Sequence, residues 1–295
     1  MRSCTARWRV HRARHRESPA TIANRRDRPS VLADSASPPD WLVGIERLRE
    51  TGWSCQAPAW QPRRMSWDEA FAVGYDEWSA HMTEDIPFYV GLAGEAAGPL
   101  VELGVGTGRV AIPVARATGR RVIGLDSSPA MLEQARINAS DAGVELDLHE
   151  TDMRDLRLDE PAGLVYCPAR ALLHVATWAD RRRAFERVAA SLRPGGRFAW
   201  NAFALDHHIA ARLDGVRQDE PEPQTIRYSV ADNRVDIIRD NGARCSLWWA
   251  TKNEWLGLLD IAGLELEALY GGFAGEAFTD NSAEYVFVAR RPPAL

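Results

Sequence analysis

Three glycines at alternate positions, Gly104, Gly106 and Gly108, follow a short apolar run that contains one acidic residue, Glu102. A buried parallel strand that passes through a tight turn into a helix has this pattern. Glycine accepts backbone angles that other residues avoid, and because it has no Cβ a ligand can lie against the main chain. The N–H groups at the start of the following helix favour an electron-rich or carboxylate-bearing ligand. The stretch is therefore a candidate ligand-binding turn, although an ordinary strand-to-helix turn has the same features.

A second apolar run, residues 121–125, ends at Asp126. An acidic residue about 20 positions after such glycines, at the end of the second strand, is placed to accept hydrogen bonds from both ribose hydroxyls of an adenosine. Two unrelated turns are the alternative interpretation. The combination favours a nucleoside-binding pair of strand–turn–helix units.

Residues 101–108 together with residues 124–132 resemble the class I S-adenosylmethionine-dependent methyltransferases. The glycine spacing is G-x-G-x-G, whereas nicotinamide-binding domains usually show G-x-G-x-x-G. The D-x-S-x-x-M-L run that begins at Asp126 also belongs to the methyltransferase pattern. The resemblance covers about residues 66–290 and implies an α/β fold with a Rossmann-like, seven-stranded sheet, mostly parallel with an antiparallel last strand. It also implies S-adenosyl-L-methionine as the cofactor.

The resemblance assigns a part of this cofactor to each candidate residue. Glu102 and the glycine turn belong to the methionine end, Asp126 to the ribose, and Asp152 with Met153 to the adenine. Asp155 competes with Asp152 for the adenine amine, and a solvated loop carboxylate is the alternative for both. The implied cofactor-binding residues are Glu102, Gly104, Gly106, Gly108, Asp126, Ser127, Met131, Asp152, Met153 and Cys167.

Two side chains are candidates for catalysis. His174 follows the fourth predicted strand, where this family often carries a histidine near the acceptor, and an unperturbed histidine titrates near working pH. Tyr75 lies in a predicted lid helix. The alternative for His174 is a histidine whose hydrogen bonds are satisfied in the core, and the alternative for Tyr75 is an aromatic residue that only packs its helix against the domain. Cys167 precedes Pro168, the reverse of the order in the cytosine C5 enzymes, so no covalent role is predicted for its thiol, although its carbonyl could bind the donor's ammonium.

Composition narrows the class of protein. The chain has 295 residues, of which 45% are hydrophobic and 26% charged, which is ordinary for a globular protein. No apolar run approaches the roughly 20 residues that span a bilayer. The four cysteines are scattered without C-x-x-C spacing, which fits a reducing cytoplasm. No metal site is predicted, because His207, His208 and His174 lack acidic or cysteine partners at regular spacing.

Charge is distributed unevenly along the chain. Residues 1–64 hold 13 basic against 6 acidic side chains, and the remainder holds 23 against 35, for a net charge of −5 overall. We expect residues 1–64 to be a basic, largely disordered extension; an RNA-binding arm, a transit peptide and a natural start at Met65 are alternatives. The acidic remainder, residues 65–295, is the predicted methyltransferase domain and argues against a nucleic-acid partner.

Two segments of that domain are expected to cover the site. Residues 66–98 read as two lid helices. Residues 203–251 contain a helix over 204–218 and then three alternating apolar runs with turn residues between them, which predicts an antiparallel β insertion after strand five. This family commonly builds its acceptor-binding cap there. Residues 264–270 and 284–289 are predicted to form a final hairpin.

The predicted function is transfer of methyl from S-adenosylmethionine to an oxygen, nitrogen or sulfur nucleophile of a small molecule, by in-line displacement. A binding module that holds the nucleoside without transferring methyl is one alternative. An RNA methyltransferase that uses the basic arm is another. The sequence leaves the acceptor open, and a homodimer could form.

Overall fold

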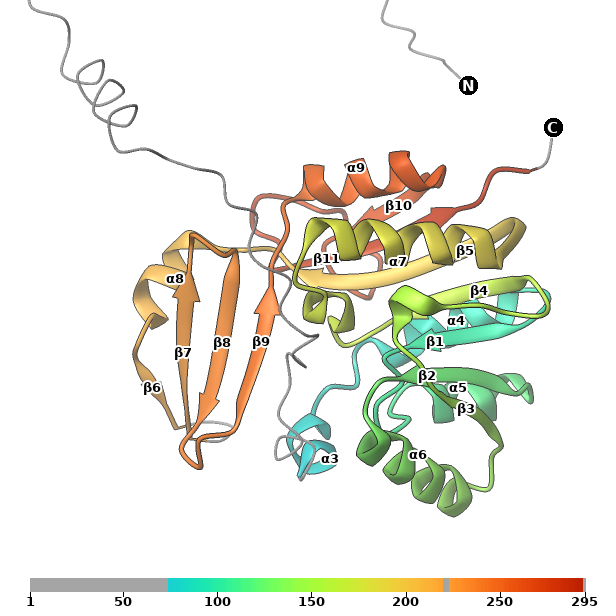
Figure 1. Cartoon of the computed structure of the whole chain (residues 1–295), viewed down its shortest axis with the longest axis horizontal. Helices are drawn as coiled ribbons and strands as arrows, with labels where there is room; N and C mark the ends of the chain where they lie inside the picture. Colours follow the sequence, from blue (N-terminus) through green and yellow to red (C-terminus); the bar gives the residue numbers. More distant parts are fainter. Residues whose placement is uncertain (1–73, 220–222, 294–295) are drawn as a thin grey trace, which may run out of the picture. The chain divides into compact units, whose positions relative to one another are not determined.

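A seven-stranded sheet in the order β10-β11-β5-β4-β1-β2-β3 organises the chain (Figure 1). The structure is a computed structural model that describes residues 74–219 and 223–293. The predicted extension over residues 1–64 and the first part of the lid, residues 66–73, lie outside the described residues. The strands are β1 (Leu100–Leu103), β2 (Val122–Asp126), β3 (Leu146–Glu150), β4 (Ala162–Cys167), β5 (Leu192–Phe203), β10 (Glu265–Tyr270) and β11 (Glu284–Arg290).

The strand directions confirm the predicted fold class. Strands β1 to β5 pair in parallel, and β11 runs antiparallel to both β5 and β10. The strand order changes direction between β1 and β4, since β2 and β3 follow on one side and β5 on the other. In open α/β sheets a ligand binds in the crevice beyond the carboxyl ends of the strands at such a point.

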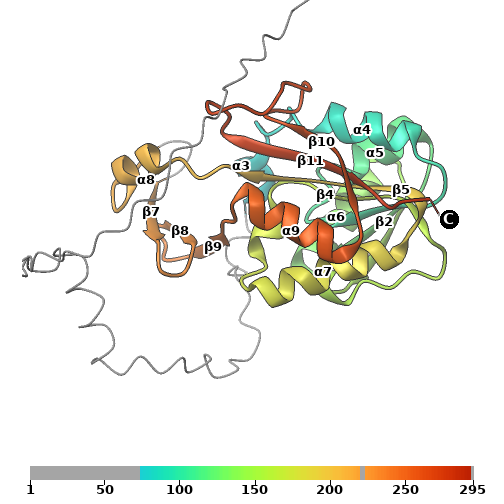
Figure 2. The ribbon, with the colours of Figure 1, turned by 90° about the horizontal axis from the view of Figure 1, so that it is seen from above.

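Helices cover both faces of this sheet, as Figure 2 shows. One face carries α4 (Ile86–Glu95), α5 (Ala111–Thr118) and α6 (Pro129–Ala142); the other carries α7 (Trp178–Ser191) and α9 (Lys252–Ala262). Because β1 and β4 are covered on both sides, every residue of these two strands is buried. This explains why they read as continuous apolar runs, and why a carboxyl group within one of them is exceptional.

Local signals fix α6 directly behind the end of β2. The Ser128 side chain accepts a hydrogen bond from the Met131 N–H and caps the helix, Pro129 occupies its first turn, and Gly143 ends it. The same logic places α9, where Thr251 and Glu254 form a capping box. The first turn of α6 therefore adjoins Asp126, as the sequence predicts.

The predicted antiparallel insertion is present as a second, four-stranded sheet after β5 (Figure 1). Its strands are β6 (Arg217–Gln218), β7 (Gln224–Ser229), β8 (Arg234–Arg239) and β9 (Arg244–Trp248). The helix predicted over 204–218 is shorter in the structure. Asp206 caps α8 (His207–Leu213), and the chain then turns at Gly215 into β6.

Three short helices complete the elements around the site: α3 (Tyr75–Ser79), η1 (Met153–Asp155) and η2 (Ala171–His174). For α7 the sequence offers Asp180, a good cap residue, as the start of a helix that ends at Leu192. The helix begins at Trp178 instead, because Thr177 supplies the cap. Within residues 74–219 and 223–293, none of the helices has the length and apolar character that crossing a membrane requires.

Candidate functional site

The glycine turn lies at the carboxyl end of β1, and its first two glycines serve different purposes. Gly104 and Gly106 have φ values of 67° and 55°, in the left-handed region. A Cβ on Gly104 would lie 2.8 Å from the Cβ of Ala171, so η2 packs directly against the turn. A Cβ on Gly106 would meet no atom within 4 Å. The main chain at Gly106 is thus open to the approach of a ligand. At Gly104 the turn that follows β1 packs against η2, the helix that follows β4.

Asp126 connects the two predicted nucleoside-binding turns. Its Oδ2 accepts a hydrogen bond from the Gly106 N–H at 2.8 Å, and its Oδ1 accepts one from the Ser128 N–H at 2.9 Å. A carboxylate oxygen can accept more than one hydrogen bond. The side chain is therefore turned toward the glycine turn, and both of its oxygens accept hydrogen bonds from the main chain. Ser127, which follows it, is exposed.

Glu102 is a carboxylic acid buried inside β1, with only 1% of its surface exposed. Burial raises the pKa of this carboxyl to about 8, against the opposing effects of the Tyr166 phenol and the Arg109 guanidinium. Among the described residues its Oε2 has no hydrogen-bond partner. A buried acceptor without a donor is costly, so this oxygen fits a ligand that brings a cationic N–H group.

The residues predicted to surround the adenine are a carboxylate that already accepts hydrogen bonds and two methionines. Asp152 caps η1 by accepting from the Arg154 N–H at 2.9 Å, and it also accepts from Arg154 Nε at 2.7 Å. Met153 reaches the glycine turn, since its Cε lies 4.0 Å from the position of a Cβ on Gly104. Met131 is buried in the first turn of α6. Asp155, the alternative to Asp152, pairs with Arg183 on α7.

His174 and Tyr75 occupy different elements. His174 ends η2, is half-buried, and desolvation lowers its pKa to about 4, so its imidazole is neutral at pH 7. Tyr75 begins α3; burial raises its pKa and the Arg109 guanidinium opposes that rise, so the phenol stays protonated at pH 7. Tyr75 thus contacts Arg109, which follows the glycine turn, whereas His174 lies at the far end of η2 from Ala171, the residue that packs against Gly104.

Comparison with known proteins supports the same chemistry. Residues 100–196 match the family described as "Methyltransferase domain". The cypemycin N-terminal methyltransferase of a Streptomyces species is 25% identical over 213 residues, which cover 65% of this chain and 82% of that protein. The dTDP-4-amino-2,3,4,6-tetradeoxy-D-glucose N,N-dimethyltransferase of Saccharopolyspora spinosa is 29% identical over 189 residues, covering 58% and 73%. The chain is a class I S-adenosylmethionine-dependent methyltransferase.

A solved structure shows the same fold with the methyl donor bound. The S-adenosylmethionine complex of CalS10, an amino pentose methyltransferase from Micromonospora echinaspora, superposes with a TM-score of 0.52 at 22% identity and covers 84% of this chain and 96% of that one. The match to the methyltransferase family, together with the named methyltransferase relatives, makes S-adenosylmethionine the cofactor of this methyltransferase, as the sequence predicts. Glu102 and Asp126, which the resemblance assigns to the ammonium and the ribose of this cofactor, lie in β1 and at the end of β2.

The thiol of Cys167 takes no part in this chemistry. Cys167 ends β4 fully buried, and burial raises the pKa of its thiol far above the ordinary value. A thiol in that state is not a nucleophile. Only the backbone of Cys167 remains available to the methyltransferase site. Among the described residues there is no group of three or more metal-ligating side chains.

Sequence reasoning missed an ion pair that holds the glycine turn. The Arg109 guanidinium donates to both carboxylate oxygens of Asp85, at 2.7 and 2.6 Å, and to the Met82 carbonyl oxygen. The two side chains are only 13% and 7% exposed. The pair fastens the segment before α4 to the residue that follows Gly108. The position of Arg109 next to the glycines was the one available signal.

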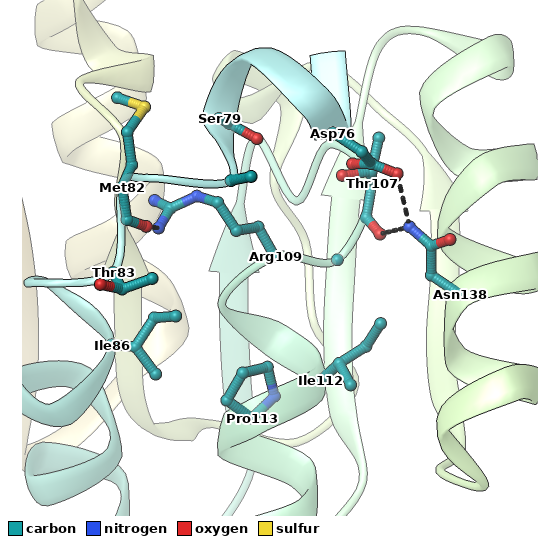
Figure 3. Close-up of a pocket in the computed structure, with 12 residues that line it drawn as sticks. Asp76, Ser79, Met82, Thr83, Ile86, Thr107, Arg109, Ile112, Pro113 and Asn138 are labelled. Carbon is teal, nitrogen blue, oxygen red and sulfur yellow. Dashed lines mark hydrogen bonds between the residues drawn. The ribbon is translucent and has the colours of Figure 1, made fainter. Parts of the chain in front are cut away.

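Asn138 of α6 forms a second missed connection, shown in Figure 3. Its Nδ2 donates to Asp76 Oδ2 on α3 and to the Thr107 carbonyl oxygen, both at 3.0 Å. These residues border a cavity of about 260 Å³ on the outer side of the glycine turn. Among the described residues, Gly108 is the one predicted cofactor residue that lines it. Asn138 therefore couples α3 to the turn.

Arg181 of α7 connects the second sheet to η2. Its Nε donates to the Val175 carbonyl oxygen at 3.0 Å, and its Nη atoms donate to the carbonyl oxygens of Trp248 and Trp249 at the end of β9. The guanidinium also lies 5.1 Å from the Trp255 ring centroid. Burial lowers its pKa to about 10, so it remains charged at pH 7. A buried cation thus joins the residue after His174 to the inserted sheet.

Proposed function

We propose that this methyltransferase methylates an amine nitrogen of its small-molecule acceptor. The observation that carries the proposal is the lowered pKa of His174, about 4, which keeps its imidazole neutral but makes it a weak base. A neutral amine attacks the methyl group with its own lone pair and loses its proton only after the bond has formed, so a weak neutral acceptor is sufficient. A hydroxyl group would need a stronger base. One relative is named for N,N-dimethylation of an amino sugar and the other for methylation at an N-terminus, which supports the same choice.

The proposed donor contacts follow from the geometry of the two turns. S-Adenosylmethionine supplies a methyl group on a cationic sulfur, which is already activated for displacement. In this proposal Glu102 Oε2 and the Cys167 carbonyl accept from the donor's ammonium, and the N–H groups of the glycine turn receive its carboxylate. Asp126 accepts from the ribose hydroxyls beside Ser127. The adenine lies between Met131 and Met153, and Asp152 accepts from its exocyclic amine.

The chain's main contribution to rate is alignment of the nitrogen with the donor and exclusion of water. Alignment alone can lower a barrier by roughly 7–11 kcal/mol. His174 accepts the proton that the nitrogen loses. Tyr75, whose raised pKa keeps its phenol protonated, donates a hydrogen bond instead of acting as a base. We infer that α3 and the insertion over 203–251 close the site as lid and acceptor cap, in a cytoplasmic protein that could dimerise.

A donor-dependent screen of amines, phenols, carboxylates and thiols tests the proposal, with S-adenosylhomocysteine as the measured product. An amine should be the best acceptor, and His174→Gln should lower kcat on it by no more than about tenfold, because a neutral amine needs little help from a base. A phenol or thiol that outperforms every amine would overturn the choice of nitrogen. No product from any class, with S-adenosylhomocysteine still bound, would instead favour a non-catalytic binding module. Activity that requires residues 1–64 and RNA would favour the nucleic-acid alternative.

A further inference from the structure

Arg170 occupies a strained position at the edge where the acceptor must approach. It lies three residues after the end of β4, and both it and Ala169 have left-handed backbone angles, with φ values of 60° and 53°. Residues other than glycine rarely adopt this conformation, and such strain concentrates at functional sites. The next residue, Ala171, packs against Gly104 of the glycine turn. The side chain of Arg170 therefore starts from the same edge of the sheet as the donor-binding turn.

A buried polar network holds this turn in place. The Arg170 N–H donates to Asn201 Oδ1 at 3.4 Å, and the same oxygen accepts from the Tyr89 hydroxyl at 3.2 Å. Asn201 Nδ2 in turn donates to Glu284 Oε1 at 2.6 Å. Tyr89, Asn201 and Glu284 are all buried, on α4, β5 and β11. Side chains from three elements thus hold Arg170, a residue of the loop that follows β4, in position.

Hydrogen bonds along one edge of the Arg170 guanidinium, through Nε and Nη2, fix its orientation. Its Nε donates to both oxygens of Glu284 at 3.1 Å, and its Nη2 donates to Oε2 at 2.7 Å. Its Cζ also lies 5.9 Å from the centroid of the Phe203 ring. Among the described residues, Nη1 has no hydrogen-bond partner. The planar group is therefore aligned in advance, with two N–H donors still available.

The exposed member of this pair is the cation. The side chain of Arg170 is 41% exposed, whereas that of Glu284 is 12% exposed and already receives donors on both oxygens. An approaching ligand thus meets N–H groups of a guanidinium and not a carboxylate. A guanidinium edge is suited to planar, bidentate contact with carboxylate or phosphate oxygens.

We propose that Arg170 is a specificity-determining residue that binds an anionic oxygen group, a carboxylate or a phosphate, on the methyl acceptor. This rests on the proposed methylation of a small-molecule amine. Glu284 and Asn201 are the positioning residues, since they fix the guanidinium without meeting the anion. The contact orients the acceptor by a group remote from its nitrogen, which is how binding energy is used for alignment.

Paired acceptors test the proposal. An amine found in the screen is offered both as its free carboxylic acid and as the corresponding carboxamide, to the wild type, Arg170→Gln and Arg170→Lys. Arg170→Gln should raise KM for the acid by roughly 10- to 100-fold, the effect of a lost charged hydrogen bond. It should change KM for the amide by less than about twofold, and Arg170→Lys should restore part of the loss. Arg182→Gln, which breaks an exposed Arg–Glu pair on α7, is the matched control and should change neither.

Two kinetic results would overturn the proposal. An equal loss on acid and amide would show that Arg170 only maintains the turn. A higher Kd for S-adenosylhomocysteine with an unchanged acceptor KM would show that it holds the donor's carboxylate instead.

Inorganic phosphate and acetate allow two further experiments that need no variant, and the second of them needs no turnover. Either anion should inhibit the wild type competitively against the acid acceptor. In the protein loaded with S-adenosylhomocysteine, titration with inorganic phosphate should shift the Nε–H resonance of Arg170 in ¹⁵N spectra. A resonance that stays in place at all phosphate concentrations would overturn the anion site. If no acceptor is methylated but this resonance shifts, the proposed function fails while the anion site stands.

Discussion

The proposed contact between Glu102 and the donor's ammonium predicts that the affinity for the methyl donor depends on pH. Its carboxyl is buried in β1, and burial raises its pKa from 4.5 to about 8, so at pH 7 most of the donor-free protein carries a proton there. A donor ammonium next to Oε2 would favour the ionised carboxylate and lower that pKa. Donor binding below pH 8 must therefore release this proton.

The size and sign of the effect follow from that shift. The donor Kd should fall as the pH rises toward 8 and level off above it, by up to about tenfold for each pH unit, or about 1.4 kcal/mol. Between pH 6 and pH 8 the limit is about 100-fold. The contribution to folding has the opposite direction. Because the folded pKa lies above the unfolded value, stabilisation by the protonated carboxyl of Glu102 is complete below pH 4.5 and is lost as the pH rises through 8.

Calorimetry with S-adenosylhomocysteine at pH 6, 7, 8 and 9 measures the effect. The comparison protein is Glu102→Gln, which has the shape of the protonated acid and cannot ionise. The amine of the ligand titrates in both experiments, so the difference between the two pH profiles isolates Glu102. The wild type should show the steeper dependence and a proton released on binding below pH 8. Identical profiles for the two proteins would refute both the ionisation and the contact with the ammonium.

Three further substitutions test other parts of the site. Asp126→Asn leaves the N–H of either Gly106 or Ser128 without an acceptor and should raise the donor Kd by roughly 10- to 100-fold in calorimetry. The control Asp141→Asn, at the exposed end of α6, should leave the donor Kd unchanged. Asn138→Ala frees α3 from the turn, so hydrogen exchange in α3 should accelerate; unchanged exchange contradicts the coupling. Arg181→Met leaves buried carbonyl oxygens without a hydrogen-bond donor and should lower the free energy of unfolding, measured in urea, by about 1–3 kcal/mol. An unchanged free energy of unfolding would show that water replaces the guanidinium.

The parts of the fold and site that could be predicted from sequence are those that local patterns encode. The alternate glycines after β1 and the acidic end of β2 are separated by about one strand–helix unit, and their spacing alone predicted that they meet. The hydrogen bond between Gly106 and Asp126 is consistent with that expectation. The antiparallel insertion was readable because asparagine-containing turns separate its alternating runs.

The missing parts depend on tertiary partners. Arg109 pairs with Asp85, Asn138 with Asp76, and these partners lie 24 and 62 positions apart without a pattern that links them. The polar network of Arg170 spans 114 positions to Glu284.

Helix boundaries failed for a different reason, since two neighbouring residues could each supply the cap. Thr177 and Asp180 are both good cap residues, and Thr177 prevails because its hydroxyl accepts the Asp180 N–H at 3.1 Å.

The place of β11 in the sheet has a consequence for biosynthesis. This strand is the last of those described to leave the ribosome, yet it inserts between β5 and β10. Until residues 284–290 emerge, one side of β5 keeps a row of unpaired N–H and C=O groups, which is a template for pairing with other nascent chains. The sheet is therefore complete only after almost the whole described chain has been made. A polypeptide that stalls before residue 284 would keep one edge of β5 unpaired and prone to aggregation.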